Sequence, residues 1–291
     1  MVKSTLFVTD VFSSSAFIQI ALGGLRKMSR IITITSGKGG VGKTTATTNL
    51  GISLAVSGYK VCLIDADFGL RNLDVPLGLT NRLILDISDY LNGICSLNHV
   101  IVSHRTLKNL HLIPGSKTKL ISELDQDLFV NMIQEIKPLY DFILIDSPAG
   151  IEGGFFNAVH TANEAIIVTT PDKTALQDAD RVIGLLEKQK MNRLSFIVNF
   201  INPSKVEIDN IINQLHIDYL GYIPPDPNII AANNKGIPIA LNPNLQSGLL
   251  FRKIANHLSK QEYNSTMEFP VTQSKQHFFL HRKLNKFKLS L

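Results

Sequence analysis

The chain has few cysteines and no long apolar stretch. Its 291 residues include two cysteines, Cys62 and Cys95, which form neither a C-x-x-C pair nor a disulfide framework. The sequence therefore indicates a protein from a reducing compartment, in which both cysteines serve only as packing residues. No run of about 18 or more apolar residues occurs, which argues against a transmembrane helix. With 44% hydrophobic and 18% charged residues, the composition is typical of a globular protein that holds one large α/β domain.

Acidic residues are missing from the C-terminal end. No Asp or Glu occurs from Phe269 to Leu291, and the basic residues of this stretch carry +5, which equals the whole net charge. Residues 1–27 add +2, so the body from residue 28 to residue 268 carries −2. Contacts of Lys and Arg with phosphates dominate nucleic-acid binding. A body without net positive charge therefore disfavours a nucleic-acid partner, although the pI is about 9.1.

Residues 1–27 precede the first predicted strand and do not look like part of the fold. Asp10, the serine run 13–15 and Gln19 interrupt their apolar character, so they make a poor secretory signal. Met28 then begins a sequence that enters a strand at once. Two interpretations stay open: an N-terminal extension from an upstream start codon, or a short, acid-poor targeting segment.

The C-terminal end divides into a linker and a basic amphipathic segment. Residues 261–276 are polar and contain one proline, which is typical of a linker. Residues 277–291 place apolar side chains on one helical face and basic side chains on the rest. The apolar positions are Leu280, Leu284, Phe287 and Leu291, and the basic ones are Arg282, Lys283, Lys286 and Lys288. This pattern favours a helix that lies on an anionic membrane surface, with a core-docked helix or a frayed end as the alternative.

A glycine-rich loop organises the rest of the chain. It follows the apolar, β-branched run 31–35 and precedes a helical pattern. A strand that ends in such a turn and leads into a helix directs several backbone N–H groups at one small volume, where the helix dipole also attracts anions. The sequence therefore predicts a phosphate-binding loop. Its residues are Gly37, Lys38, Gly39, Gly40, Val41, Gly42, Lys43, Thr44 and Thr45.

The same loop also fits the dinucleotide-binding pattern G-x-G-x-x-G, with Asp65 about twenty residues further on where a ribose-binding acid belongs. The combined pattern nevertheless favours a nucleoside triphosphatase, because a hydride-transferring enzyme needs neither a Lys-Thr pair nor further strand-end carboxylates. The features that favour it are Lys43 with Thr44, Asp67, and Asp146 at the end of another apolar strand.

Each part of a phosphoryl-transfer site has a candidate residue. This chemistry needs positioning and charge neutralisation more than covalent help. Lys43 would reach the outer phosphates, while Thr44 and Asp146 would hold Mg²⁺. Asp67 would orient the attacking water. Asp65 would either support the Mg²⁺ site or anchor the loop, and simple loop capping is the alternative for both of these aspartates.

Strand and helix patterns alternate along the body. Strands are predicted at 31–35, 60–65, 110–113, 142–146, 165–169, 194–199 and 219–223, and helices at 44–57, 122–136, 173–190, 206–215 and 246–258. This alternation predicts a three-layer α/β fold of the P-loop NTPase type, with helices on both faces of a mostly parallel sheet. The ATPase domain is expected to span residues 28–260. A proline-rich loop with Pro225 and Asp226 is expected at the base end of the nucleotide.

The loop resembles that of one family. Residues 38–45, KGGVGKTT, match the deviant Walker A box K-G-G-x-G-K-T-[ST] of the ParA/MinD ATPases. Residues 65–74 and 146–152 are similar to the two switch segments of that family. The resemblance covers residues 28–258 and the type of tail, and it departs from the family in the N-terminal extension and the longer linker.

The resemblance implies an ATP hydrolase that uses Mg²⁺ and forms a homodimer with ATP. It implies that Lys38 reaches the partner's phosphates, that Asp178 pairs with this lysine, and that Asn199 contacts the adenine. It further implies membrane binding through the C-terminal helix, release after hydrolysis, and a role in placing a division septum. An activator of the MinE type and a division inhibitor are the implied partners.

Two related classes are disfavoured by what the sequence lacks. A DNA-partitioning ATPase of the same superfamily is the alternative function, and the charge of −2 on the body argues against it. An iron–sulfur carrier would need a cysteine pair, which Cys62 and Cys95 do not supply.

The composition also bears on localisation. The abundance of Ile, Asn and Lys suits an AT-rich genome. We therefore expect a plastid stroma with peripheral membrane association, or else a bacterial cytoplasm and the inner face of its membrane.

Overall fold

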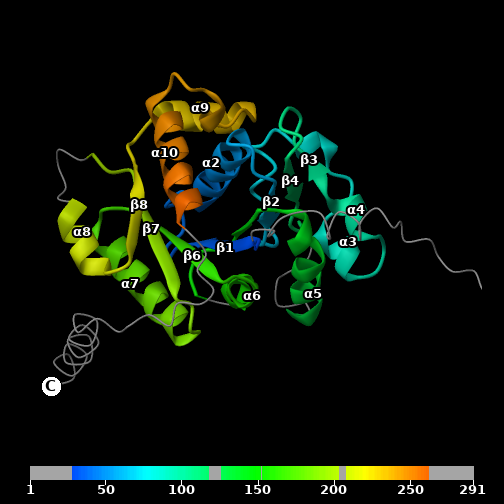
Figure 1. The fold of residues 1–291 in the computed structure, drawn as a ribbon, viewed down its shortest axis with the longest axis horizontal. Helices are drawn as coiled ribbons and strands as arrows, with labels where there is room; N and C mark the ends of the chain where they lie inside the picture. Colours follow the sequence, from blue (N-terminus) through cyan, green and yellow to red (C-terminus); the bar gives the residue numbers. More distant parts are fainter. Residues whose placement is uncertain (1–27, 118–125, 152, 203–207, 262–291) are drawn as a thin grey trace, which may run out of the picture. The chain divides into compact units, whose positions relative to one another are not determined.

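The apolar runs of the sequence form one eight-stranded sheet in the computed structural model, which describes residues 28–117, 126–151, 153–202 and 208–261 (Figure 1). The strands are β1 (Arg30–Thr35), β2 (Val61–Asp65), β3 (Val102–Ser103), β4 (Leu110–Ile113), β5 (Phe142–Asp146), β6 (Glu164–Thr169), β7 (Arg193–Asn199) and β8 (Asp218–Ile223). Their order in the sheet is β3-β4-β2-β5-β1-β6-β7-β8. Every pair is parallel except β3 and β4. The predicted mostly parallel sheet is therefore confirmed.

Helices cover both faces of this sheet. They are α2 (Lys43–Val56), α3 (Ile87–Leu91), α4 (Leu97–Val100), α5 (Gln126–Ile136), α6 (Gly153–Thr161), α7 (Lys173–Lys188), α8 (Ile208–Leu215), α9 (Pro227–Lys235) and α10 (Gln246–Lys260). Apolar side chains of α2, α9 and α10 form one core with one face of the sheet, and those of α3 to α8 form two cores with the other. Figure 1 shows α2, α9 and α10 together on one side of the strands. The three-layer prediction is confirmed.

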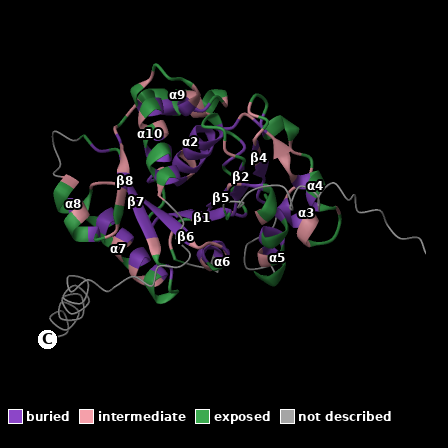
Figure 2. Ribbon diagram, viewed as in Figure 1, coloured by how far each residue is buried: buried purple, intermediate pink, exposed green. Residues whose placement is uncertain are grey.

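Burial on both faces explains why the central strands are unbroken apolar runs. In β5, Phe142 and Leu144 enter the core that α2 and α10 cover, whereas Ile143 and Ile145 enter the core that α5 covers. Alternate residues of a strand point to opposite faces, so each face requires its own apolar set. Figure 2 shows the strands buried between helices whose outer surfaces are exposed.

The structure also contains elements that the sequence pattern did not predict. The proline-rich stretch after β8 was predicted to be a loop, but it begins α9: Asp226 is the N-cap, its side chain accepts a hydrogen bond from the Asn228 amide, and Pro227 follows in the first turn. Proline is favoured there because that position needs no intrahelical N–H. The short helices α3, α4 and α6 and the antiparallel edge strand β3 were likewise missed.

A buried ion pair joins the first strand to two other elements. Arg30, 1% exposed, donates from Nε to Glu164 Oε1 at 2.7 Å. Its Nη1 donates to the carbonyl of Leu258 near the end of α10. Arg193 adds a second cation 3.5 Å from the same carboxylate. The strand that leads into the glycine-rich loop is thereby tied to β6 and to the last described helix.

Several predicted segments fall outside the described residues. They are the extension 1–27, the linker beyond residue 261, and the amphipathic segment 277–291 with all of its apolar and basic positions. Within the described residues, no helix combines the length and the apolar character that crossing a membrane requires.

Candidate functional site

The glycine-rich loop connects β1 to α2 and requires glycine at particular positions. Gly40 and Gly42 have φ angles of 78° and 94°, in the left-handed region. A Cβ on Gly42 would lie 2.2 Å from Nδ2 of Asn199, and a Cβ on Gly37 would lie 2.5 Å from the carbonyl carbon of Asp178. The loop is thus pressed against β7 and α7, and a larger residue would displace it.

The N-terminus of α2 opens into this loop. Gly42 is the N-cap residue and provides no side-chain hydrogen bond to the first turn. The first amides of a helix have no intrahelical acceptor, so they are available to an anion. Asn199 supports the loop from the side, because its Nδ2 donates to the Val41 carbonyl at 2.8 Å. The arrangement fits the predicted phosphate cradle.

A hydroxyl and a carboxylate meet at the base of the cradle. Thr44 Oγ1 donates to Asp146 Oδ2 at 2.7 Å, and Thr47 Oγ1 lies 3.0 Å from Asp146 Oδ1. Asp146 is 1% exposed, and burial raises its pKa to about 6, although Lys43 and the two hydroxyls oppose the rise. Hydroxyl and carboxylate oxygens are ligands that Mg²⁺ prefers. Thr44 and Asp146 therefore fit the predicted Mg²⁺ site. Binding of the ion would replace the hydrogen bond between them.

Sequence reasoning missed Thr47, although a signal was available. Thr47 follows Thr44 by three residues, and residues three apart lie on the same face of a helix. Once Thr44 is assigned to the site, the next threonine on that face becomes a candidate partner for the same carboxylate.

Asp65 anchors the loop that follows β2. Its carboxylate accepts hydrogen bonds from the amides of Asn72 at 2.8 Å, Leu73 at 3.0 Å and Asp67 at 3.1 Å. It also lies opposite Asp146 in the parallel register. Burial and the neighbouring Asp146 raise the pKa of Asp65 to about 7. Of the two roles considered for Asp65, the geometry favours the loop anchor.

Lys43 lies close enough to Asp67 to act on it electrostatically. Lys43 is 8% exposed, and its charge lowers the pKa of both Asp67 and Asp146. Burial has the larger effect on Asp67, so its pKa is still raised above the ordinary value. Asn72 Nδ2 donates to Asp67 at 3.2 Å and holds the carboxylate in place. The predicted partners of the terminal phosphate are thus brought together.

Lys38 lies on the surface, and its ion pair among the described residues is with Asp172, not with Asp178 as predicted. Its Nζ lies 3.9 Å from Asp172 Oδ1, and both side chains are about half exposed. The Asp178 carboxylate instead pairs with Arg181 at 3.1 Å, while its backbone contacts Gly37. Within the single chain, then, Lys38 faces Asp172 rather than Asp178. The role of Lys38 in a dimer stays a prediction.

The residues predicted at the base end have structural contacts of their own. Asp226 caps α9 and accepts a hydrogen bond from Ser247 of α10 at 2.7 Å, so its side chain ties the two helices together. Pro225 precedes it on the surface. Sequence reasoning also missed Asn233 of α9, whose Nδ2 donates to Thr45 Oγ1 at 3.2 Å. No motif indicates this contact, because tertiary packing brings α9 to the loop.

The match to known proteins agrees with this geometry. A family model described as an AAA domain matches residues 29–200. The septum site-determining protein MinD of Synechocystis sp. is 45% identical over 242 residues, which are 81% of this chain and 91% of that protein. The chain belongs to the MinD family. A MinD relative from Chlorella vulgaris is 44% identical over 265 residues, or 87% of this chain and 94% of the relative.

Solved structures of MinD proteins share the fold. The chain aligns with the MinC:MinD cell division protein complex of Aquifex aeolicus with a TM-score of 0.75 and 40% identity, covering 81% of this chain and 98% of that one. MinD of Pyrococcus horikoshii, complexed with Mg-ADP, aligns with a TM-score of 0.74 and 33% identity over 80% of this chain and 97% of that one. The resemblance to the ParA/MinD ATPases and the P-loop NTPase fold are therefore confirmed.

Proposed function

We propose that this MinD-family protein binds ATP with Mg²⁺ and hydrolyses it. The observation that carries the proposal is the meeting of the Thr44 hydroxyl with the Asp146 carboxylate at the open N-terminus of α2, beside buried Lys43. The Mg-ADP complex of the Pyrococcus horikoshii relative supports it.

Different residues bind the phosphates, bind Mg²⁺ and orient the attacking water in phosphoryl transfer. The loop amides from Gly39 to Thr44 and the Lys43 ammonium hold the phosphates. Thr44 and Asp146 would hold Mg²⁺, which neutralises phosphate charge when bound. Asp67, held by the hydrogen bond from Asn72, orients the attacking water.

We further propose a cycle of dimerisation and membrane binding. The exposed Lys38 is available to reach the phosphates of a second copy in an ATP-bound homodimer. Two C-terminal amphipathic helices held together bind a membrane more strongly than one, because the second binds at a high effective concentration. Hydrolysis separates the pair and releases it, and the cycle helps to place a division septum in a plastid or a bacterial cell.

The proposed protein partners are a MinC-type division inhibitor and a MinE-type activator. The Aquifex aeolicus complex of a relative with MinC supports the first. The second rests on the family resemblance alone.

A substitution at Thr44 tests the nucleotide site. Thr44→Val removes the hydroxyl that meets Asp146, and we expect at least about a tenfold loss of Mg²⁺-dependent ATP hydrolysis. Thr48→Val is the matched control, since Thr48 is buried on the same helix and its hydroxyl has no partner among the described residues. Equal rates for the two variants would contradict the assignment of Thr44.

Two further variants test the cycle. Lys38→Ala should prevent ATP-dependent dimerisation in light scattering, whereas Lys188→Ala, on the far end of α7, should not. A chain that ends before His277 should hydrolyse ATP but fail to sediment with anionic vesicles. Unchanged sedimentation would refute the membrane role. A gel shift of non-specific DNA that depends on ATP, measured at a defined salt concentration, would favour the DNA-partitioning alternative.

A further inference from the structure

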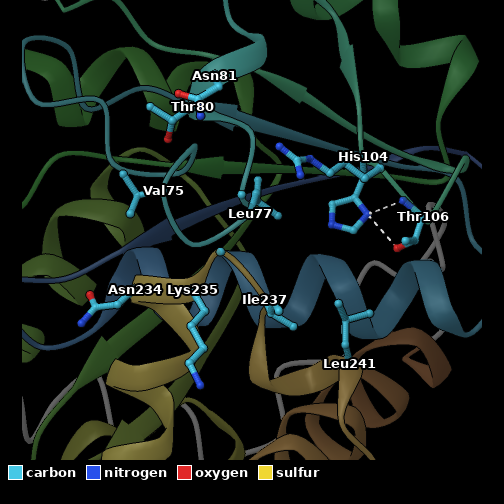
Figure 3. Close-up of a pocket in the computed structure, with 13 residues that line it drawn as sticks. Val75, Leu77, Thr80, Asn81, His104, Thr106, Asn234, Lys235, Ile237 and Leu241 are labelled. Atoms are coloured by element: carbon cyan, nitrogen blue, oxygen red, sulfur yellow. Dashed lines mark hydrogen bonds between the residues drawn. The ribbon is translucent and has the colours of Figure 1, made fainter.

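A cavity with a volume of about 570 Å³ lies outside the glycine-rich loop. This volume falls within the usual range of small-molecule sites. Figure 3 shows its walls: the segment that carries Val75 to Asn81, the turn that carries His104 and Thr106, and the segment from Asn234 to Leu241, which joins α9 to α10. None of residues 37–45 lines it, so it is a site separate from the nucleotide cradle.

The walls of this cavity are held in place. Gly78 and Gly236 press together, since a Cβ on Gly78 would lie 2.5 Å from the Gly236 carbonyl oxygen. The segment before Val75 is anchored through the Leu73 amide to Asp65 at 3.0 Å. On the other wall, Asn233 of α9 donates to Thr45 at 3.2 Å. The cavity is therefore formed in advance of any ligand.

His104 directs an unpartnered donor into this cavity. The residue is 4% exposed, and its Nδ1 accepts hydrogen bonds from the amides of Leu107 at 3.2 Å and Thr106 at 3.4 Å. Because Nδ1 is an acceptor, the ring proton of the neutral imidazole is on Nε2. No described residue accepts a hydrogen bond from Nε2. Figure 3 shows the ring pointing from its turn toward the space beside Ile237 and Leu241, with its Nδ1 edge turned to Thr106.

The charge around this donor has one sign. Arg105 and Lys235 line the cavity, and no carboxylate does. Burial, together with the charges of Arg105 and Arg82, lowers the pKa of His104, which favours the neutral imidazole. An anion beside Nε2 would accept a hydrogen bond from it and would lie near the charge of Arg105.

The remaining walls are apolar. Val75, Leu77, Ile237 and Leu241 contribute aliphatic side chains to the lining, and Ile237 is 58% exposed although it borders the cavity. Such a surface gains free energy when an apolar body covers it.

We propose that this cavity binds a small amphiphilic anion, in which one carboxylate or phosphate monoester carries a short apolar chain. The anionic group accepts hydrogen bonds from His104 Nε2 and Arg105, and the apolar chain lies along Leu77, Ile237 and Leu241.

The first test is a titration of the full-length protein, with ¹⁵N-labelled histidine and without nucleotide, against hexyl phosphate and hexanoate. We expect the His104 Nε2 resonance to shift, with a dissociation constant below about 1 mM for at least one of them. Whichever of the two amphiphiles binds more tightly identifies the preferred anionic group, phosphate or carboxylate. Inorganic phosphate and hexanol are the controls and should each bind at least about tenfold more weakly. Failure of both amphiphiles, or equal binding of inorganic phosphate, would overturn the proposal.

The second test changes the exposed cation, so the fold is not at risk. Arg105→Gln should weaken binding roughly tenfold, because it removes a charge-assisted hydrogen bond. Lys188→Gln removes the same charge on the other face of the sheet and should leave binding unchanged. Equal effects of the two variants would show a general charge effect and refute the cavity as the site. Since nucleotide is absent throughout, the outcome is independent of the proposed ATPase.

Discussion

The hydroxyl of Thr47 provides a quantitative test of the hydrogen bonding at Asp146. Thr47 is fully buried, and its Oγ1 lies 3.0 Å from both Asp146 Oδ1 and the Lys43 carbonyl. One hydroxyl proton serves one acceptor at a time, and the buried carboxylate is the stronger acceptor. Thr47→Val keeps the shape and removes this donor, so we expect a loss of about 1.5–3 kcal/mol in the free energy of unfolding.

The measurement is urea and thermal unfolding at pH 7.5 without nucleotide. For a domain of this size the loss corresponds to a fall in Tm of roughly 3–12 °C. Thr47→Ser retains the hydroxyl and should recover most of the loss. Thr48→Val makes the same chemical change one residue later, where the buried hydroxyl has no described partner, and should leave stability unchanged or higher. If Thr47→Val and Thr48→Val unfold alike, the hydrogen bond to Asp146 contributes nothing and the reasoning is wrong.

Three other changes have calculable outcomes. Gly42→Ala places a Cβ 2.2 Å from Asn199 at a φ of 94°, so calorimetry should show no ATP binding and unfolding should show a loss of at least about 2 kcal/mol. Glu164→Gln leaves Arg30 buried without its charged partner and should cost about 3–5 kcal/mol in urea unfolding. Hydrogen bonds from two neighbouring threonine hydroxyls hold the pKa of Asp172 well below its usual range. Its contribution is therefore complete above about pH 5 and is lost progressively as the pH falls toward the lowered pKa, so the stability difference from Asp172→Ala should shrink toward pH 2.

Each of these outcomes has a contradicting result. An unchanged ATP affinity in Gly42→Ala would mean that the loop can shift away from Asn199 of β7 without disturbing the nucleotide site. A Glu164→Gln variant as stable as the parent would mean that Arg30 finds another acceptor. A stability difference for Asp172→Ala that stays constant from pH 6 to pH 2 would show that the carboxylate is not stabilised in its charged form.

Local signals explain which elements were predictable. The central strands were predicted within a residue or two, because a strand buried on both faces must be an unbroken apolar run. The helix α9 was missed, because a proline that permits the first turn of a helix looks the same in sequence as one that ends a strand. The small elements α3, α4 and β3 hold their places through contacts with the rest of the domain, which no short window of sequence contains.

The same division applies to the candidate site. The proximity of Lys43, Thr44 and Asp146 could be predicted from the sequence. Their motifs define both the residue type and its position, and a parallel sheet brings the carboxyl ends of its strands to one edge. The role of Asp65 was left open because a strand-end carboxylate serves an ion or a loop equally well. Only the three amides that converge on it favour the anchor.

The sequence by itself determined the P-loop NTPase fold and the glycine-rich loop between β1 and α2, because glycine positions, a helix start and apolar strands are local patterns of the chain. Tertiary structure decided what surrounds the cradle. Thr47 and Asn233 became part of it only when α2 and α9 packed beside the strands. The cavity around His104 likewise requires segments about 160 residues apart in the chain to meet, and their contact at Gly78 and Gly236 depends on the folded backbone alone.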